Sequence, residues 1–229
     1  MRKLYILHHL GLGDHIICNG LIRKVLDDDS VVIFMPVKIH NIFNIFRMFI
    51  DISQRINIIP VENDRDMILF SRYFKHDEII KIGIFNETYN HIHSSFCEKF
   101  YRQLDFDYSA RWDRFHIQEN NSTYIKNYNN EECFVHEDRS RNLLIKEAYL
   151  KGKSCYRPDH TLGVKDNNTI FDYVEILKNV KEIHCMDSSF ACLIDHLPYL
   201  AEKKKFIHRY IRESSENPVY KNSWTILYE

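Results

Sequence analysis

The sequence lacks an excess of charge of either sign. Its 31 Lys and Arg residues are balanced by 32 Asp and Glu residues, which gives a formal net charge of −1. Proteins that bind nucleic acids or anionic membrane surfaces electrostatically carry a basic excess or a basic patch. The composition therefore argues against a nucleic-acid partner.

Long apolar runs and paired cysteine motifs are also missing. No segment approaches the roughly 18 consecutive apolar residues of a transmembrane helix, and the N-terminus lacks the apolar region of a signal peptide. None of the six cysteines forms a C-x-x-C pair: Cys18, Cys97, Cys133, Cys155, Cys185 and Cys192. Most lie in apolar surroundings, which favours buried free thiols in a reducing compartment over disulfides. We therefore expect a cytoplasmic protein without a transmembrane segment.

What the sequence does contain is enough apolar material for a real core. Hydrophobic residues make up 45% of its 229 residues, and aromatic residues make up 14%. This length accommodates one large domain or two compact ones. Alternating apolar runs and helical patterns then decide the fold class.

The first half alternates short, fully apolar runs with helix-periodic segments. Such runs are typical of strands buried on both faces of a parallel sheet. The predicted strands are Lys3–His8, Val31–Met35 (closed by Pro36), Arg55–Pro60 and Glu78–Ile84. The predicted helices are Ile16–Leu26, Ile42–Ile50 and Ser94–Leu104.

A polar stretch, Gln118–Asn130, interrupts this alternation and is the best candidate for a linker. Beyond it the sequence predicts strands at Cys133–His136, Glu182–Met186 and Lys205–His208, and helices at Phe171–Asn179 and Ser189–Leu197. The restart predicts an α/β protein of two Rossmann-like lobes facing a cleft near residues 115–132. The predicted domains are residues 1–120 and 131–229, and a single continuous domain is the alternative.

A glycine-containing turn follows the first predicted strand: Gly11-Leu12-Gly13-Asp14-His15. Glycines there let a ligand approach the backbone, and a plain tight turn with positive φ is the alternative. The turn is not a dinucleotide fingerprint, because Ile16 stands where the third glycine belongs. Asp14 is either the N-cap of the next helix or a general base.

Two further motifs follow strands of the second half. Asp187-Ser188-Ser189 stands at a helix start, where hydroxyl and backbone N–H groups form either a phosphate site or a capping segment. His136, Arg139 and Arg141 follow an earlier strand, and guanidinium groups pair well with a diphosphate. A solvated, internally paired charged turn is the alternative for this second motif.

Some weaker patterns carry less information. The triplets Asp64-Arg65-Asp66 and Asp105-Phe106-Asp107 match the D-x-D of metal-binding glycosyltransferases, but such triplets are frequent by chance. His91 and His93 are spaced to share one face of a strand without a third metal ligand. The run Lys203–Lys205 is predicted to be a solvated helix end.

Together the three motifs resemble the GT-B glycosyltransferases, most closely the heptosyltransferase-like branch. The first half resembles the family in the segment from Gly13 to Arg23, and Asp187-Ser188-Ser189 stands where the family has Asp-Ser/Thr-Gly. The resemblance implies two facing Rossmann domains. The C-terminal domain would hold a nucleotide-sugar, and the N-terminal domain would hold the acceptor, with no metal required.

The expected function is transfer of a sugar from a nucleotide-sugar to a glycan, a lipid-linked molecule or another hydroxyl acceptor, with no further cofactor. Asp14 would be the catalytic base, and Gly11, Gly13 and His15 would line the acceptor side. The donor-binding residues would be His136, Arg139, Arg141, Asp187, Ser188 and Ser189. An S-adenosylmethionine-dependent methyltransferase and a non-catalytic nucleotide- or glycan-binding relative are the alternatives.

Overall fold

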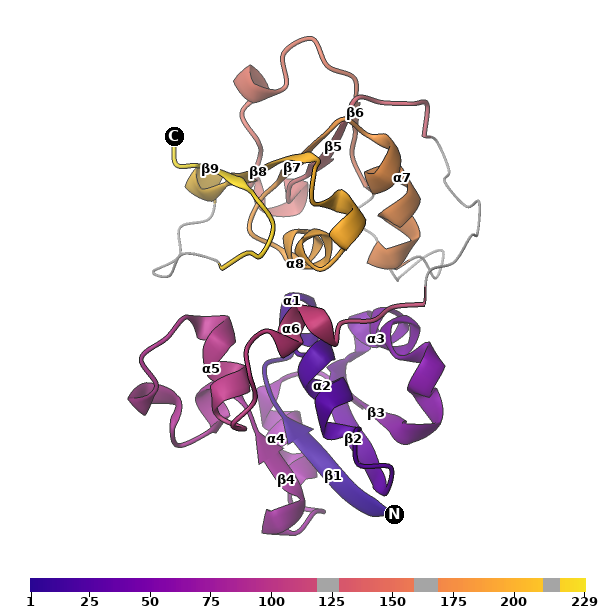
Figure 1. The fold of residues 1–229 in the computed structure, drawn as a ribbon, viewed down its shortest axis with the longest axis vertical. Helices are drawn as coiled ribbons and strands as arrows, with labels where there is room; N and C mark the ends of the chain where they lie inside the picture. Colours follow the sequence, from indigo (N-terminus) through magenta and orange to yellow (C-terminus); the bar gives the residue numbers. More distant parts are fainter. Residues whose placement is uncertain (119–127, 159–168, 212–218) are drawn as a thin grey trace. The chain divides into compact units, whose positions relative to one another are not determined.

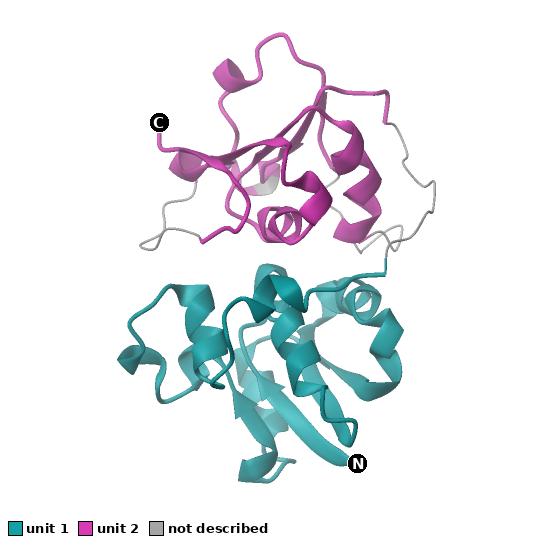
Figure 2. Cartoon of the chain, in the orientation of Figure 1, with its two compact units in different colours: residues 1–118 teal, residues 119–229 magenta. Residues whose placement is uncertain are grey.

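The structure, a computed structural model, describes residues 1–118, 128–158, 169–211 and 219–229. The chain divides into two compact units, residues 1–118 and 119–229 (Figure 2). Each unit contains its own parallel sheet with helices (Figure 1), so the expected α/β class with two sheet-containing lobes is confirmed. The predicted linker, Gln118–Asn130, falls largely outside the described residues, as does half of the segment 115–132 near which the cleft was predicted.

The sheet of unit 1 has four parallel strands in the order β3-β2-β1-β4. The strands are β1 (Arg2–Leu7), β2 (Val31–Lys38), β3 (Ile56–Val61) and β4 (Ile79–Lys81). The apolar runs predicted from the sequence became strands because both sheet faces are covered, which leaves few positions for polar side chains.

Strand β2 does not end at Pro36, as the sequence predicted, but continues to Lys38. β1 pairs with β2 only as far as Phe34. Pro36 lies beyond that point, opposite Ile59 of β3. A proline is tolerated where one neighbouring strand has already ended, because its missing N–H then breaks no ladder on that side.

Unit 1 has six α-helices and several short 3₁₀ turns among its described residues. The α-helices are α1 (Leu12–Ile17), α2 (Asn19–Val25), α3 (Ile42–Met48), α4 (Asp64–Ser71), α5 (Phe96–Arg102) and α6 (Ala110–Asp113). The 3₁₀ turns are η1 (Ile39–Asn41), η2 (Ile50–Arg55), η3 (His76–Glu78), η4 (Gly83–Phe85) and η5 (Tyr89–His91). The single helix predicted over Ile16–Leu26 starts earlier and is broken at Cys18, where the Tyr101 hydroxyl donates to the Ile17 carbonyl at 2.6 Å.

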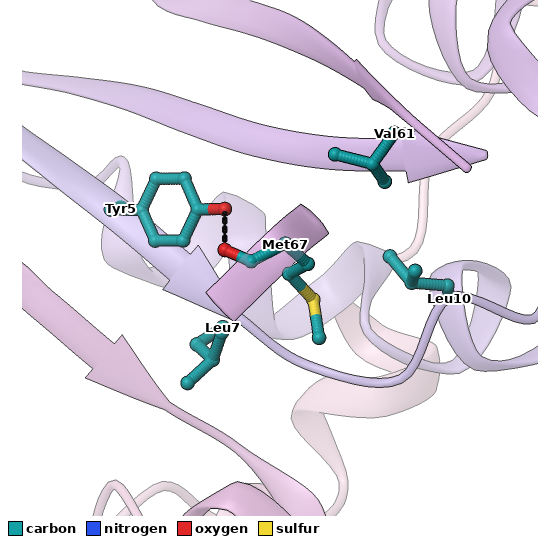
Figure 3. Packing of buried hydrophobic residues seen from close by; sticks show 5 residues of the cluster. All are labelled: Tyr5, Leu7, Leu10, Val61 and Met67. Carbon is teal, nitrogen blue, oxygen red and sulfur yellow. Dashed lines mark hydrogen bonds between the residues drawn. The ribbon is translucent and has the colours of Figure 1, made fainter. Parts of the chain in front are cut away.

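The core of unit 1 lies between the sheet and its helices. On one face, Tyr5, Leu7 and Leu10 pack against Val61 and against Met67 of α4 (Figure 3). The Tyr5 hydroxyl donates to the Met67 carbonyl at 2.7 Å, so the one polar atom of this ring is satisfied inside the core (Figure 3). Helix α2 lies on the other face of the sheet (Figure 1).

The sheet of unit 2 has five parallel strands in the order β6-β5-β7-β8-β9. They are β5 (Cys133–His136), β6 (Cys155–Tyr156), β7 (Glu182–Cys185), β8 (Lys204–His208) and β9 (Thr225–Leu227). The helices are α7 (Val174–Asn179) and α8 (Ser189–Asp195). The short 3₁₀ turns among the described residues of this unit are η6 (Arg139–Arg141), η7 (Glu147–Tyr149), η8 (Ile170–Tyr173), η9 (Pro198–Leu200) and η10 (Arg209–Ile211).

The two faces of this second sheet are covered differently. On one face Phe134 packs against Phe190 of α8, with ring centroids 5.2 Å apart. On the other face Cys133 and Val135 pack against Ile145 and Leu150, which come from an irregular segment between β5 and β6. One face is therefore helical and aromatic, and the other is covered by non-helical chain.

The run Lys203–Lys205 is not a solvated helix end. Lys204 begins β8, and Lys205 is 2% exposed. The Lys205 ammonium donates to the carbonyls of Leu200 and Ala201, both at 2.6 Å. The sequence prediction failed because three consecutive lysines usually lie in water, whereas here backbone carbonyls take the place of water. No helix among the described residues has the length and apolar character needed to cross a membrane.

Candidate functional site

Each sheet has one point where the strand order reverses, and a motif predicted from the sequence lies at each. In unit 1 the chain runs from β1 outward to β3 and returns to β4 on the other side of β1. In unit 2 it runs from β5 to the edge strand β6 and returns to β7 on the other side of β5. In open parallel sheets, ligands bind outside the carboxyl ends of the strands at these switch points.

His136 and Ser188 meet at the switch point of unit 2. His136 is the last residue of β5, and Ser188 follows β7. The Ser188 Oγ and the His136 Nδ1 are 2.9 Å apart, and the His136 ring lies 4.6 Å from the ring of Phe190. Two residues that lie 52 positions apart in the sequence thus join the carboxyl ends of neighbouring strands.

Ser188 occupies the N-cap position of α8, but its side chain does not cap the helix. An N-cap serine normally accepts a hydrogen bond from the second or third N–H of the helix. Here the hydroxyl contacts His136 instead. Ser188 therefore lies at the N-cap position, as the capping alternative predicted, but its hydroxyl makes no capping hydrogen bond. Ser189 follows as the first residue of α8 and is half-buried.

Arg139 and Arg141 lie in η6, just beyond β5, and both side chains are more than half exposed. Arg139 donates to Glu137 at 3.0 Å, and Arg141 pairs with Asp138. The charged turn with internal ion pairs, which was the alternative interpretation of this motif, is therefore present. A guanidinium has five N–H donors, so one ion pair still leaves it able to bind an anion.

Glu137 organises this turn from a buried position. Its carboxylate accepts the backbone N–H of Ile145 at 3.0 Å, and it also pairs with Arg139 and with Arg157 at 3.2 Å. Burial raises the pKa of Glu137, but the Ile145 hydrogen bond and the two guanidinium groups outweigh it, so the pKa is lowered. Glu137 therefore stays ionised and holds two arginines near the end of β5.

Asp187 is turned toward the end of β8. Its carboxylate accepts from Arg209 at 3.0 Å and from the Tyr220 hydroxyl at 3.3 Å. Arg209 directly follows β8 and is buried. These contacts tie the end of β7 to the end of β8.

In unit 1 the N-cap of α1 is Gly11, and Asp14 is the third residue of the helix. Asp14 is therefore not the N-cap that one alternative proposed. Gly11 has φ −70°, so positive φ is not the reason for a glycine there. A Cβ at Gly11 would lie 2.6 Å from Asp14 Oδ2, so the glycine leaves room for the carboxylate to fold back over the turn. Gly13 lies between them, inside α1.

His15 and His8 form a buried pair beneath this turn. Their ring centroids are 4.4 Å apart in an edge-on arrangement, and both residues are almost fully buried. None of their ring nitrogens has a hydrogen-bond partner among the described residues. Burial lowers the pKa of His8 to about 3 and that of His15 well below its ordinary value, so both rings are neutral at neutral pH.

His9 joins the ends of β1 and β4. Its ring stacks on Phe100, with centroids 5.4 Å apart, and its Nε2 accepts the Ile84 N–H at 3.3 Å. Gly83 has φ +69°, and a Cβ there would lie 2.3 Å from His9 Nε2. Only glycine fits this position, because it permits both the left-handed backbone and the close approach of the ring.

The weaker patterns lie on other elements than the two switch-point motifs. Asp64 and Asp66 lie in the first turn of α4, where acidic residues favour a helix start. His91 ends a 3₁₀ turn and is not part of a strand. Together with His93 and Asp105 it lines an open hollow of about 510 Å³.

Sequence reasoning missed several residues that organise the site. Glu137 lies inside the charged turn after β5 but was given no role of its own. Arg157 carried no signal, because it follows a strand of only two residues. Arg209 could have been found, since it directly follows a predicted strand. His9 was seen only as part of a turn, and its contact with the end of β4 depends on tertiary structure.

No protein-family profile and no curated protein matches the sequence. Two solved structures are similar to it. Both are the E. coli heptosyltransferase WaaC, one with ADP-2-deoxy-2-fluoro heptose and one with ADP. The first covers 99% of this chain and 93% of its own, with 9% identity and a TM-score of 0.49. The second covers 99% and 90%, with 10% identity and a TM-score of 0.48. At these values the likeness assigns no activity and no residue role.

Proposed function

We propose that this chain is a glycosyltransferase that moves a sugar from a nucleotide-sugar to a hydroxyl acceptor. The observation that carries the proposal is the contact between His136 and Ser188 at the switch point of unit 2, 2.9 Å from Nδ1 to Oγ. It places two polar side chains and the start of α8 where parallel sheets bind ligands. The resemblance of the three motifs to GT-B enzymes supplies the reaction class.

The donor diphosphate would bind at the carboxyl edge of the unit 2 sheet. His136, Ser188 and Ser189 would contact it, and Arg139 and Arg141 would supply positive charge. Asp187 would hold the ends of β7 and β8 in place through Arg209. Glu137, by fixing Arg139, would keep one guanidinium oriented before the ligand arrives. Preorganised charge of this kind stabilises a departing diphosphate.

In this proposal the acceptor oxygen attacks the anomeric carbon while the bond from that carbon to the diphosphate oxygen breaks. Asp14 takes the proton of the acceptor hydroxyl as general base, and the nucleoside diphosphate leaves with the bonding electrons. Gly11, Gly13 and His15 belong to the acceptor side. His15 is buried beneath the turn, so it would act by shaping the turn rather than by touching the acceptor.

The test is a thermal-shift screen of the full chain against nucleoside diphosphates, nucleotide-sugars and S-adenosylmethionine. A ligand that binds only the folded state raises the melting temperature, by an amount set by its concentration relative to Kd. We expect a shift with a nucleoside diphosphate or its sugar, followed by release of the nucleoside diphosphate in a transfer assay. Binding without turnover would support the non-catalytic alternative, and a shift with S-adenosylmethionine alone would contradict the proposal.

The double variant Arg139→Ala/Arg141→Ala tests the donor site directly. It should weaken nucleotide binding by several kcal/mol, on the scale of roughly 1.5–3 kcal/mol for each charged hydrogen bond. The matched control is Lys151→Ala/Lys181→Ala, which removes the same charge from exposed residues of the same unit. Lys181 immediately precedes β7, at the opposite edge of the sheet. Equal weakening in both variants would show a general electrostatic effect and no site.

A further inference from the structure

A second cluster of reactive side chains lies at the opposite, amino edge of the unit 2 sheet. Cys133 is the first residue of β5 and pairs in register with Cys155, the first residue of β6. On its other side Cys133 pairs in register with Glu182, the first residue of β7. His184 stands two positions further along β7, on the same face as Glu182. The topology therefore gathers two thiols, a carboxylate and an imidazole on one face.

The ligand atoms of this cluster are close together. One atom each from Cys133, Glu182 and His184 lie within 4.8 Å of one another. Cys155 lies outside this group of three. It is the register neighbour of Cys133, and its thiol donates to the Lys153 carbonyl at 3.5 Å. Cys133 and His184 are buried, whereas Cys155 and Glu182 are half-buried, so the cluster has a dry side and a side open to water.

We propose that the four side chains of this cluster bind one zinc ion: Cys133, Cys155, Glu182 and His184. Two thiolates, an imidazole and a carboxylate match the sulfur, nitrogen and oxygen ligands that zinc takes in tetrahedral sites. Each thiol loses its proton to solvent as the ion binds, so two protons are released for one divalent ion. The site is separate from the proposed donor site, which lies at the other edge of the sheet, and does not depend on the proposed function.

The surroundings of His184 supply the support that a metal-ligating imidazole needs. Its Nδ1 lies 3.0 Å from His208 Nε2, and His208 Nδ1 lies 3.0 Å from the Tyr210 hydroxyl. When the far nitrogen of His184 binds the ion, the Nδ1–H donates to His208 and fixes the ring. Such outer partners orient the ligand, and losing one typically weakens metal binding about 10–100-fold.

One residue already shows that the cluster attracts a cation. The Lys153 ammonium pairs with Glu182, and its charge also acts on both thiols. The Lys153 side chain is 32% exposed, so it can turn into solvent when a divalent ion takes its place. The ion would then join three short strands, of four, two and four residues.

The test is titration of the reduced, untagged full chain with Co²⁺, followed by Zn²⁺. We expect one equivalent of Co²⁺ to give a thiolate charge-transfer band and the visible bands of tetrahedral cobalt, and Zn²⁺ to bleach them. One equivalent of Zn²⁺ should also raise the melting temperature and slow alkylation of Cys155. His208→Gln should weaken Co²⁺ binding about 10–100-fold.

Cys155→Ser is the decisive variant, because the residue is half-buried and its replacement should leave the fold intact, which circular dichroism checks. Because Cys133 remains as one thiolate, this variant should lose about half of the charge-transfer intensity at saturating Co²⁺ and should bind Co²⁺ more weakly. Its matched control is Cys97→Ser, another half-buried cysteine, in unit 1, which should keep the band. The proposal is overturned if one equivalent of Co²⁺ gives no thiolate band, or if Cys155→Ser and Cys97→Ser behave alike.

Discussion

Asp14 can be interpreted in two ways, as a catalytic base or as a charge that only stabilises its helix. It is the third residue of α1, with Gly11 as the N-cap. A negative charge in a first helical turn contributes about 0.3–1 kcal/mol to stability, whereas a general base contributes about 10²–10⁴-fold to rate. Asp14→Asn keeps the shape of the side chain and removes its charge.

We expect Asp14→Asn to keep nucleotide binding and to lower the melting temperature only slightly, while transfer falls by about 10²–10⁴-fold. The measurement is release of nucleoside diphosphate at saturating donor. Asp66→Asn is the matched control, because Asp66 is likewise the third residue of a helix that follows a strand. Transfer at the parent rate in the Asp14 variant would assign the proton to another group.

At the scale of elements, Gly83 fixes the connection between the end of β4 and the ring of His9. Gly83→Ala should destabilise unit 1 through two effects. An alanine at φ +69° costs roughly 1–2 kcal/mol, and its Cβ would also meet the His9 ring at 2.3 Å. We expect the total loss to exceed the cost of backbone strain alone, measured by urea unfolding.

Gly152→Ala separates the two effects. Gly152 has φ +71°, but a Cβ there meets nothing within 4 Å, so it reports strain alone. The chain has two tryptophans, Trp112 in unit 1 and Trp224 in unit 2, whose fluorescence follows each unit when the other is replaced by Phe. An equal loss of unfolding free energy in Gly83→Ala and Gly152→Ala would mean that the His9 ring moves aside without an energetic cost.

Predictability from sequence differed between elements for physical reasons. The strand Cys133–His136 was predicted with its observed bounds, and β2 was predicted only from Val31 to Met35, because buried apolar runs are distinctive but Pro36 suggested an end. β6 and β9 were missed because edge strands of two and three residues have no readable period. Helix α4 was missed because its polar first turn resembles a D-x-D triplet.

The same reasoning explains what was found of the candidate sites. His136 and Ser188 were predicted because they lie at or just beyond the carboxyl ends of strands, and parallel strands end at one edge of a sheet. Which of the side chains in these sites contact each other could not be predicted. Glu137 binds Arg157 across 20 positions, and the zinc cluster takes its four ligands from three strands. Such contacts are set by strand order, which sequence periodicity does not contain.

At the scale of the whole molecule, the buried His8 predicts acid sensitivity. The pKa of His8 is lowered to about 3 from 6.5, first by burial and then by the nearby charge of His9. Between these values the unfolded chain binds a proton that the folded chain excludes. Stability therefore falls as pH falls through this window, by about 1.4 kcal/mol per pH unit for one histidine.

His8→Leu removes this titration without removing a hydrogen bond to any described residue. We expect the parent to lose stability between about pH 6 and pH 4.5, and the variant to lose less, with a slope smaller by about one proton. Urea unfolding followed by Trp112 fluorescence in a Trp224→Phe background measures this for unit 1. Identical slopes would show that the folded state accepts a proton on His8 at these pH values.

Each sheet is drawn from one continuous stretch of chain, and this has a consequence for biosynthesis. The four strands of unit 1 lie within residues 2–81, and the described strands of unit 2 lie within residues 133–227. All strands of unit 1 therefore emerge from the ribosome before the first strand of unit 2 is made. Since domains fold as units during synthesis, unit 1 can complete its pairings without competition from later strands of similar apolar character.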